Sequence, residues 1–561
     1  MSQRKPVAVF GLDAAPPALL ETWMQEGHLE NFSRLKEKGV YGYVKNYEIY
    51  STDVAWTTFA CGCSPSKTGY WAAQRFVEGT YNCKTRAAYD YQEFPPFFAL
   101  GDDYRVAAFD IPQIRLNPNV NGLQVEAWGA HSPQVPSGSL PEPLFQEIVD
   151  THGEHPGLHK DYAVCLDLKS TLKVEEMLLT GLDRREAICK DILSREQWDL
   201  FVTVFGETHG GGHNFWHLSQ PDHPYYELLR SRIDHDPLLA VYKRIDRALG
   251  NILDTLSDDT TVVIFSSHGM GPGRIDLPTI AFLPEFLYRM NFPGKTALGG
   301  NRPAGSPLAP VADRMQMKYW ERDLWITRHD DNPVRRWLRR YVPNRLFPMV
   351  EPWLEPKSTP DNPELVSWLN LLRQPGDKLC PWMPSLWYQD FWPHMKAFAL
   401  PSFEAGQIRI NLKGREPNGL VDPADYHAYC DELIEKLGTL KDARTGTPMV
   451  ADVIRTRQDP NDSDPKLHHA DLLIEWQKAV VSDVVESAEY GQIGPYPIYR
   501  AGNHTADAFV LAYGPGIPKG ETLPGEMHSL DITPTILDLM GAPIPEHMEG
   551  KPIPLRQDSL V

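Results

Sequence analysis

Four short apolar runs stand out along the chain. They cover Val7 to Phe10, Leu200 to Phe205, Thr261 to Phe265 and Ala508 to Ala512, and each ends abruptly in a polar or glycine-rich segment. The runs are β-branched or aromatic and do not alternate with polar residues, which is typical of strands buried on both faces of a parallel sheet. Between them, residues 239–253 carry apolar side chains every three or four positions, the pattern of an amphipathic helix. Alternating strands and helices predict a doubly wound α/β sheet.

Residues with metal-binding side chains follow three of these predicted strands. Asp13 comes shortly after the first, the run from Glu207 through His209 to His213 follows the second, and His268 follows the third. In open α/β sheets, ligands bind outside the carboxyl ends of the strands. We therefore expect these side chains to meet in one site although they are far apart in sequence.

Two long segments interrupt this rhythm. Residues 71–199 contain clusters of Pro and Gly, and residues 275–400 are rich in Pro, Trp and Arg. We interpret both as insertions into one domain spanning residues 1–561, the second as a cap over the active edge of the sheet. The basic, aromatic segment 333–341 is predicted to be a solvated helix with its Trp packed inward, and the alternative is contact with a membrane surface or an acidic partner.

Composition narrows the class of protein. A hydrophobic content of 42% indicates a well-packed globular chain, and a net charge of −19 argues against binding of nucleic acid polymers. No run approaches the ~20 apolar residues of a membrane span, and the first residues lack the apolar stretch of a signal peptide. With seven cysteines at no framework spacing, these features predict a cytoplasmic protein.

Each candidate residue also has an ordinary structural interpretation. Asp13 can bind a cation or cap the helix that starts near Pro17, and Thr52 can act as an activated nucleophile or as a simple N-cap. A hydroxyl at a helix N-terminus sits where backbone N–H groups favour an anion, which suits a reaction at a phosphate or sulfate ester.

The strongest local signal is Glu207-Thr-His-Gly-Gly-Gly-His213. His209 and His213 are four residues apart, the spacing of a helical ligand pair, although the three glycines argue against a regular helix. His268 and His504 lie in glycine-containing turns, where they can reach into a crowded site and complete a metal centre.

In this order, the motifs resemble those of the alkaline phosphatase superfamily, most closely its type I phosphodiesterase/nucleotide pyrophosphatase branch with bacterial phosphohydrolase members. The resemblance rests on five stretches: Gly-Leu-Asp13, Thr52 ahead of Ala-Trp-Thr-Thr-Phe-Ala-Cys-Gly-Cys-Ser-Pro65, Gly-His213-Asn-Phe-Trp, Ser-His268-Gly-Met-Gly and Gly-Asn-His504. It implies an alkaline-phosphatase-like core, a mostly parallel sheet sandwiched between helices, with large insertions forming a cap.

The resemblance also implies a chemistry. Members usually bind two zinc-type ions and form a covalent intermediate on a Thr or Ser hydroxyl. By position, Asp13, Thr52 and His268 match one ion's ligands and nucleophile, and His213 and His504 match the other's. We therefore expect a hydrolase of small phosphate esters, either diesters or monoesters, that uses Thr52 and one or two divalent ions, Zn or alternatively Mn.

Two positions depart from the family pattern. Ser267 stands where members commonly have Asp before the histidine, which removes an anionic ligand. His209 stands where members commonly have Asp, which creates a possible three-histidine set with His213 and His504. Glu207 is then either a ligand itself or orients His209. The site can hold two ions with altered ligands, hold one, or have lost hydrolysis.

Other activities on this fold remain alternatives. A phosphoryl transferase or mutase would pass the phosphoryl group to an alcohol, and a sulfatase or phosphonate hydrolase would act on a different ester or bond. The specialised sulfatase motif Cys-x-Pro-x-Arg is absent from the chain. The contrasting class is a non-catalytic binding protein with a degenerate metal site, which Ser267 motivates.

Overall fold

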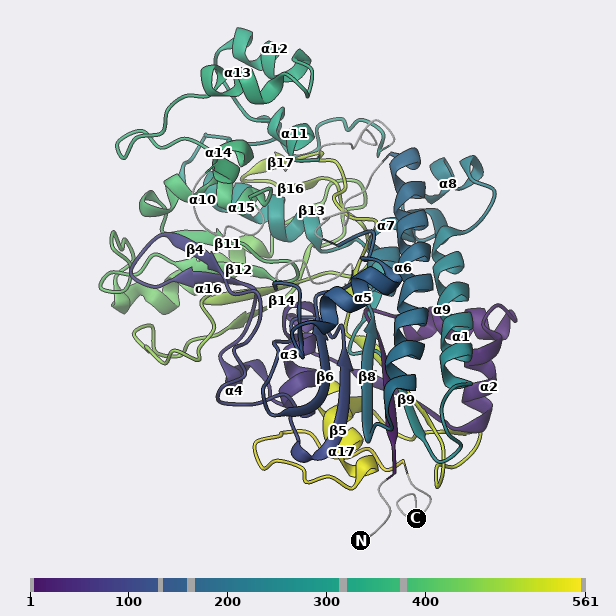
Figure 1. The fold of residues 1–561 in the computed structure, drawn as a ribbon. Coiled ribbons are helices and arrows are strands. Elements are labelled where there is room, and N and C mark those ends of the chain that lie inside the picture. The colour runs from purple at the N-terminus through teal and green to yellow at the C-terminus, as the bar shows by residue number, and fades with distance from the viewer. Residues whose placement is uncertain (1–4, 130–134, 159–166, 312–319, 374–380, 556–561) are drawn as a thin grey trace.

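The structure is a computed structural model that describes residues 5–129, 135–158, 167–311, 320–373 and 381–555. The side chains of Ser51 and Thr52 also lie outside the described part. The architecture is α/β, as the sequence predicts, with a central sheet sandwiched between helices and a second lobe built on small antiparallel sheets (Figure 1).

The central sheet has ten strands and a largely parallel core. Strands β9, β1, β8, β5 and β6 lie side by side in parallel. In spatial order the sheet contains β20 (Glu521–Thr522), β2 (Val40–Lys45), β19 (Asp507–Tyr513), β9 (Thr261–Phe265), β1 (Val7–Leu12), β8 (Leu200–Phe205), β5 (Gly101–Phe109), β6 (Val120–Glu126) and β7 (Gly138–Leu140), with β21 (Met527–His528) also paired to β2.

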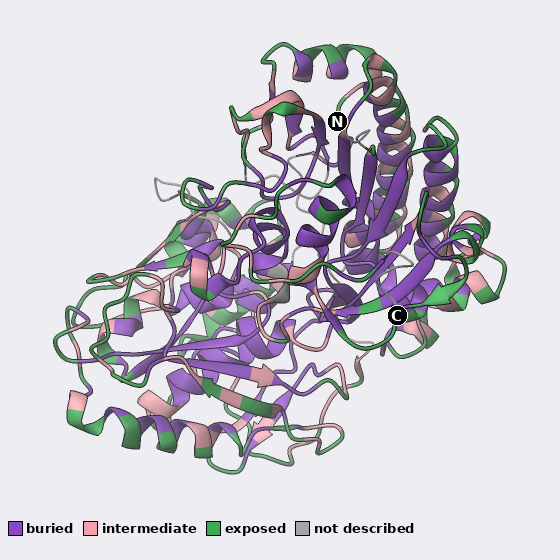
Figure 2. Cartoon of the chain, turned by 90° about the horizontal axis from the view of Figure 1, so that it is seen from below, coloured by how far each residue is buried: buried purple, intermediate pink, exposed green. Residues whose placement is uncertain are grey.

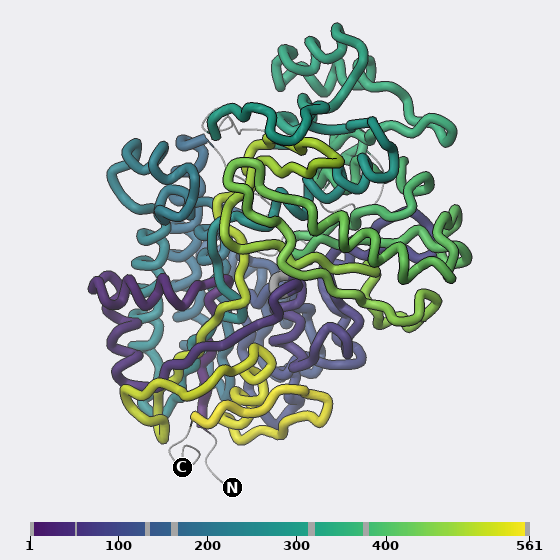
Figure 3. Tube along the Cα trace, turned by 180° about the vertical axis from the view of Figure 1, so that it is seen from behind, coloured from purple at the N-terminus to yellow at the C-terminus, as the bar shows by residue number. Residues whose placement is uncertain are grey.

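All four apolar runs of the sequence form strands of this sheet, but the expectation that all are parallel is wrong for the last one. Strand β19 runs antiparallel to both β9 and β2. It directly follows β18 (Gly502–Thr505), which pairs with β10 (Gly269–Pro272) just beyond the carboxyl end of β9. The chain therefore enters β19 from the carboxyl edge of the sheet and must run backwards. As a result, β2 from the N-terminal part of the chain lies beside β19 from the C-terminal part (Figure 3).

Helices cover both faces of the sheet because successive side chains of a strand point to opposite faces. Ala8 and Phe10 of β1 belong to one core, and Val7 and Val9 belong to the other. The first core is covered by α1 (Pro17–Gln25), α2 (Glu30–Lys38), α5 (Leu144–His152), α6 (Leu168–Arg195), α7 (Glu207–Ser219) and α9 (Pro237–Leu253), and the second by α3 (Ser51–Cys61) and α17 (Ile532–Met540). The helix expected over residues 239–253 is thus α9. Figure 2 shows the buried strands between helices that are exposed only on their outer sides.

The two expected insertions have different structures. Residues 71–199 contain β5, β6 and β7 of the central sheet as well as the hairpin β3 (Gln74–Val77) and β4 (Asn82–Thr85), so a large part of this segment belongs to the sheet and its flanking helices. Residues 275–400 contribute helices to the second lobe, namely α10 (Leu283–Asn291), α11 (Trp320–Trp325), α12 (Pro333–Tyr341), α13 (Phe347–Leu354), α14 (Trp368–Arg373) and α15 (Pro384–Trp387).

The second lobe is completed by later parts of the chain. Its sheets are β11 (Ala397–Leu400), β12 (Gly406–Ile410), β15 (Leu472–Trp476) and β14 (Val450–Arg455), and separately β13 (Lys441–Asp442), β16 (Val485–Ser487) and β17 (Gly491–Ile493), with α16 (Tyr426–Leu437) beside them. Helix α12 occupies the segment predicted to be helical, but Trp337 is 59% exposed, so the expectation that this Trp packs inward is wrong. No helix in the described ranges is long and apolar enough to cross a membrane.

Candidate metal centre

The candidate residues gather at the carboxyl edge of the central sheet. Asp13 directly follows β1, α7 begins two residues after β8, and His268 lies three residues after β9. The fourth segment is the ribbon of β10 and β18, where His504 is the register partner of Met270. The structure thus brings together Asp13, His209, His213 and His268, which the strand pattern predicts to meet, and places His504 beside them.

Helix α7 carries two of the histidines on one face. The expectation that the three glycines prevent a regular helix is wrong, because α7 runs without interruption from Glu207 to Ser219. The glycines instead allow close packing: a Cβ on Gly212 would lie 2.7 Å from Met270 Cγ, and a Cβ on Gly502 would lie 2.3 Å from the Gly212 carbonyl oxygen. The helix can therefore approach the ribbon that carries His504.

His209, His213 and His504 form a compact cluster. Their candidate ligand atoms lie within 4.8 Å of one another, and Nε2 of His213 lies 3.1 Å from Nε2 of His209. His213 Nδ1 donates to the Gly502 carbonyl at 2.7 Å, since a carbonyl oxygen can only accept. A neutral His213 therefore presents the lone pair of Nε2 to the cluster. A ligand histidine fixed through its other nitrogen is the usual arrangement at metal sites.

Asp13 and His268 form a second group of donors. Asp13 is fully buried, and its Oδ1 accepts from the Trp56 indole at 3.2 Å and lies 3.6 Å from His268 Nε2. On the other side of the ring, Ser267 Oγ lies 2.9 Å from His268 Nδ1. Ser267, the departure from the family pattern, is thus placed to orient His268.

The two groups adjoin through His504. Its ring centroid lies 4.7 Å from that of His213, 4.9 Å from that of His209 and 5.1 Å from that of His268. Nitrogen and carboxylate donors from four separate segments therefore share one buried region, and this donor set suits zinc and similar borderline cations.

The sequence profile of the type I phosphodiesterase / nucleotide pyrophosphatase family matches residues 7–352, more than half of the chain. The chain belongs to this family. The family is part of the alkaline phosphatase superfamily, as the motifs predict. The matched residues include Asp13, Thr52, His209, His213 and His268, whereas His504 lies beyond them.

Three solved structures to which this family member is similar share little sequence with it. Mouse ectonucleotide pyrophosphatase/phosphodiesterase 5 shares 12% identity over 97% of each chain with a TM-score of 0.45. Phosphonoacetate hydrolase from Sinorhizobium meliloti 1021, in complex with phosphonoformate, shares 11% identity over 96% of each chain with a TM-score of 0.44. A mutant of the alkaline phosphatase PafA shares 13% identity over 99% of each chain with a TM-score of 0.49. No curated protein matches this chain in sequence. Likenesses this distant assign no substrate.

Glu207, a predicted ligand or orienting group, is engaged elsewhere. Both of its carboxylate oxygens accept from Arg185 Nε, at 3.0 and 3.1 Å, and His155 Nε2 lies 3.3 Å from one of them. Burial alone would raise the pKa of Glu207, but the charge of Arg185 and the contacts with His155 lower it to about 2. Arg185 also donates to Asp110 at 2.8 Å. Because its carboxylate belongs to this buried ion pair, we leave Glu207 out of the proposed ligand set.

Thr52 belongs to the first turn of α3, and its side chain lies outside the described residues. One turn later on the same helix, Trp56 donates to Asp13. Thr52 therefore remains a sequence-based prediction, with a backbone position one helical turn from the residue that contacts the candidate ligand Asp13.

Several supporting residues were not singled out from the sequence. Thr208 Oγ1 donates to the carbonyls of Asp13 and Phe205, at 2.5 and 2.9 Å, and so ties together the ends of β1 and β8. Asn46 donates to the Ser267 carbonyl at 2.8 Å. Trp56 was recognisable because it follows Thr52 at helical spacing, whereas Thr208 and Asn46 carry no signal of their own.

Buried charges lie close to the ribbon. Asp53 and Asp276 both have a pKa raised to about 7 by burial, against the lowering effect of the Arg500 charge on each. The guanidinium of Arg500 lies 3.9 Å from Asp276 and over the ring of Tyr499, at 5.0 Å from its centroid. This cation lies four residues before His504 in the sequence and adds positive potential beside the ribbon.

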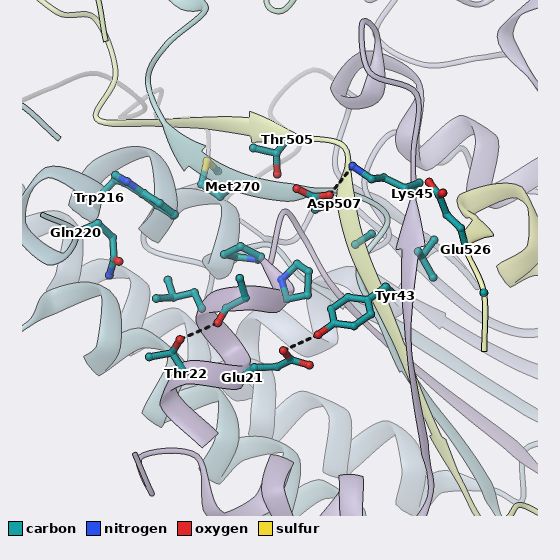
Figure 4. Close-up of a pocket in the computed structure, with 17 residues that line it drawn as sticks. Glu21, Thr22, Tyr43, Lys45, Trp216, Gln220, Met270, Thr505, Asp507 and Glu526 are labelled. Carbon is teal, nitrogen blue, oxygen red and sulfur yellow. Dashed lines mark hydrogen bonds and ion pairs between the residues drawn. The ribbon is translucent and has the colours of Figure 1, made fainter. Parts of the chain in front are cut away.

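Two hollows border the ribbon. A cavity of about 690 Å³ lies between α1, α7 and the edge of β2 (Figure 4), but its lining includes none of the proposed ligands. A smaller hollow lies beside His504 and is lined in part by Arg274, Lys478 and Trp476. The same hollow is also lined by the carboxylates of Glu48, Glu404 and Glu475, and Lys478 pairs with Glu48 and Glu475. It adjoins the candidate ligand His504, but its lining carries no excess of positive charge.

Proposed function

We propose that the protein is a metal-dependent hydrolase of phosphate esters, acting on a phosphodiester or phosphomonoester through a covalent intermediate on Thr52. Family membership supports the general class of reaction. The observation that carries the proposal is the cluster of His209, His213 and His504 next to Asp13 and His268.

The donor set fits a divalent ion of the zinc type. His209, His213 and His504 would hold one ion as neutral imidazoles, and Asp13 and His268, with Thr52, would hold another. A bound divalent ion lowers the pKa of a hydroxyl and offsets the negative charge of a phosphate ester. The Ser267 hydroxyl at His268 Nδ1 and the Gly502 carbonyl at His213 Nδ1 would keep the other ring nitrogens aimed at the site.

In the proposed reaction, the Thr52 oxygen attacks phosphorus while the hydroxyl proton leaves. The bond between phosphorus and the leaving alcohol breaks, and the alcohol takes up a proton. Water then attacks the phosphothreonine, which releases the phosphate product and restores the hydroxyl. Trp56 would fix Asp13 for this step through its indole hydrogen bond, and Arg500 would favour binding of the anionic ester.

The test compares turnover of an aryl phosphate and an aryl phosphodiester by the zinc-loaded protein and its variants. We expect Thr52→Ala to abolish turnover while the far-UV circular dichroism spectrum stays unchanged, because the nucleophile is lost but the helix is not. Ser66→Ala, which removes an exposed hydroxyl from the neighbouring α4 (Pro65–Thr68), should retain wild-type activity. Wild-type turnover by Thr52→Ala would rule out this nucleophile.

Metal content separates an enzyme from a binding protein with a degenerate site. We expect His504→Ala to lose bound zinc by elemental analysis, and His235→Ala, at an exposed histidine paired with Glu175, to keep it. If the wild-type protein retains no metal after loading with zinc or manganese, the hydrolase proposal fails.

Ser267→Asp probes the number of ions. This substitution restores the carboxylate that the family pattern has at this position. A rise in both metal content and activity would favour two ions at a site weakened by the missing carboxylate. A loss of activity would mean that the native site requires the Ser267 contact to His268 and differs from the usual arrangement of the family.

A further inference from the structure

Helices α12 and α13 form an unusual surface on the second lobe. Of the twelve strongly exposed large hydrophobic residues in the described part of the chain, six lie on or next to these two short helices. They are Val334, Trp337, Tyr341, Leu346, Met349 and Trp353, which are 42% to 87% exposed. We call this set the α12–α13 surface.

The spacing places these residues on one face of each helix. Val334, Trp337 and Tyr341 follow the pattern i, i+3, i+7, and so do Leu346, Met349 and Trp353. Residues at this spacing share one helix face. Trp337 and Tyr341 also touch, with ring centroids 5.5 Å apart. The exposed apolar face is therefore an organised stripe on each helix.

The opposite side of this helix pair is firmly anchored. Arg339 is fully buried and donates to Asp330 at 2.6 Å and to Glu355 at 2.8 Å. Phe347 is buried beneath the guanidinium of Arg322, which lies 3.5 Å from the ring centroid. The contacts of Arg339 and Phe347 fix the inner side of the helix pair, so the exposed residues of the α12–α13 surface face away from the lobe.

The surface is also strongly basic. Residues 333–354 contain five arginines and a single acid, Glu351, which is buried and paired with Arg373. Three of the arginines, Arg336, Arg340 and Arg345, are exposed beside the aromatic stripe. The whole chain carries a net charge of −19, so this segment is a local reversal of sign.

The place of α12 and α13 in the molecule makes this surface accessible to a large partner. Figures 1 and 3 show the two helices at the outer end of the second lobe, away from the central sheet. Helices at this outer position can meet an extended surface without obstruction by the central sheet.

We propose that the α12–α13 surface binds an anionic phospholipid bilayer. Trp and Tyr side chains favour the interface between headgroups and acyl chains, and basic residues beside them attract anionic headgroups. The positive charge of the segment complements the negative charge of the bilayer, whereas the acidic remainder of the protein is repelled by it. The protein would therefore meet the bilayer through this segment. A stripe of aromatic residues flanked by arginines has the composition of a helix face that lies in the bilayer interface.

The experiment measures co-sedimentation of the full chain with large unilamellar vesicles. One set consists of phosphatidylcholine alone, and the other contains phosphatidylcholine mixed with phosphatidylglycerol. We expect binding to the mixed vesicles only, with affinity that falls as salt is raised. Trp337→Ala combined with Trp353→Ala should weaken binding about tenfold, since two interfacial aromatic side chains are removed.

Two further variants make the result specific. Arg336→Gln combined with Arg340→Gln should also weaken binding to mixed vesicles and flatten its salt dependence. The matched control, Leu420→Ala combined with Ile454→Ala, removes hydrophobic residues that are 42% and 39% exposed elsewhere and should bind as the wild type does. Because these residues lie outside the metal centre, all variants should keep wild-type metal content, so failure here is distinguishable from failure of the proposed hydrolase function.

Three outcomes would overturn the proposal. The first is no sedimentation with mixed vesicles at low salt, and the second is equal binding to neutral and mixed vesicles. The third is an equal loss of binding in the Trp double variant and in the Leu420/Ile454 control. If vesicles fail to bind but an acidic protein binds to the α12–α13 surface, the partner is a protein and the first of these outcomes applies.

Discussion

At the scale of single residues, metal binding at the candidate centre would depend on which nitrogen of each histidine carries its proton. The Gly502 carbonyl can only accept, so it fixes the proton of neutral His213 on Nδ1. Ser267 contacts Nδ1 of His268, while Nε2 of the same ring faces Asp13. Neighbours without metal-binding chemistry thus decide whether a histidine is available as a ligand.

A buried histidine away from this centre predicts acid sensitivity. Burial lowers the pKa of His468 to about 4, and its Nδ1 accepts from the Ala470 N–H at 3.0 Å. In the unfolded chain the pKa is about 6.5, so between these values the unfolded state binds the additional proton. This contribution to stability is complete above pH 6.5 and is lost as the pH falls toward 4.

We therefore expect His468→Asn to be less acid-sensitive than the wild type. The Asn oxygen can accept from Ala470 and does not titrate. Between pH 7 and pH 5, the wild-type free energy of unfolding should fall by about 2 kcal/mol more than that of the variant, measured by urea denaturation at both values. Equal losses would show that His468 is already protonated in the folded state, or that it remains neutral after unfolding.

Single residues also mark how far the sequence could predict the site. Asp13 and the four histidines could be found because each follows a predicted strand or lies in a recognisable motif. The engagement of Glu207 could not, because its partners Arg185 and His155 come from a segment with no motif. A carboxylate two residues before a histidine ligand has no local feature that distinguishes a metal ligand from a partner in an ion pair.

At the scale of elements, the glycines of α7 have two different roles. A Cβ on Gly212 would clash with Met270, whereas a Cβ on Gly211 would meet Leu238 Cδ1 at 3.4 Å, close to an ordinary contact distance. One glycine is thus required by packing and the other is not.

These two positions give a matched pair of predictions. Gly212→Ala should destabilise the protein by roughly 1–3 kcal/mol, because the packed Met270 side chain or the backbone around it must shift to relieve the clash. Gly211→Ala should be neutral or stabilise by up to about 1 kcal/mol, because Ala favours a helix over Gly. Chemical denaturation of both variants provides the measurement, and an equal effect at the two positions would contradict the role assigned to Gly212.

Elements with a strong pattern were predictable, and those that depend on tertiary contacts were not. The strands at 7–10, 200–205 and 261–265 follow from short continuous apolar runs, and the helix at 239–253 follows from apolar periodicity. The helical state of α7 and the reversed direction of β19 depend on contacts with the β10–β18 ribbon, which joins residues far apart in sequence. The outward Trp337 was missed because apolar spacing in a helix reports a face but not what covers it.

At the scale of the whole molecule, a bound ion would join distant parts of the chain. His209 and His213 belong to α7, and His504 belongs to β18. An ion that binds only the folded arrangement stabilises it by about 2.7 kcal/mol when its free concentration is one hundred times Kd.

We therefore expect a chelator to lower the apparent Tm of the wild-type protein by a few degrees, and added zinc to restore it. His504→Ala should have a lower Tm from the start and respond little to either treatment, whereas His235→Ala should respond as the wild type does. Differential scanning fluorimetry of the three proteins checks this. A chelator response that survives in His504→Ala would place the stabilising ion elsewhere.

The order in which the ribosome makes the chain gives one more consequence of the sheet topology. Strand β2 is among the first strands synthesised, but its neighbours in the sheet are β19, β20 and β21, which emerge only near the end of translation. Until then both edges of β2 lack their partners, and unpaired strand edges promote aggregation. The central sheet is therefore completed late. A nascent chain interrupted before residue 507 would expose the unpaired edges of β2 to chaperones or proteases.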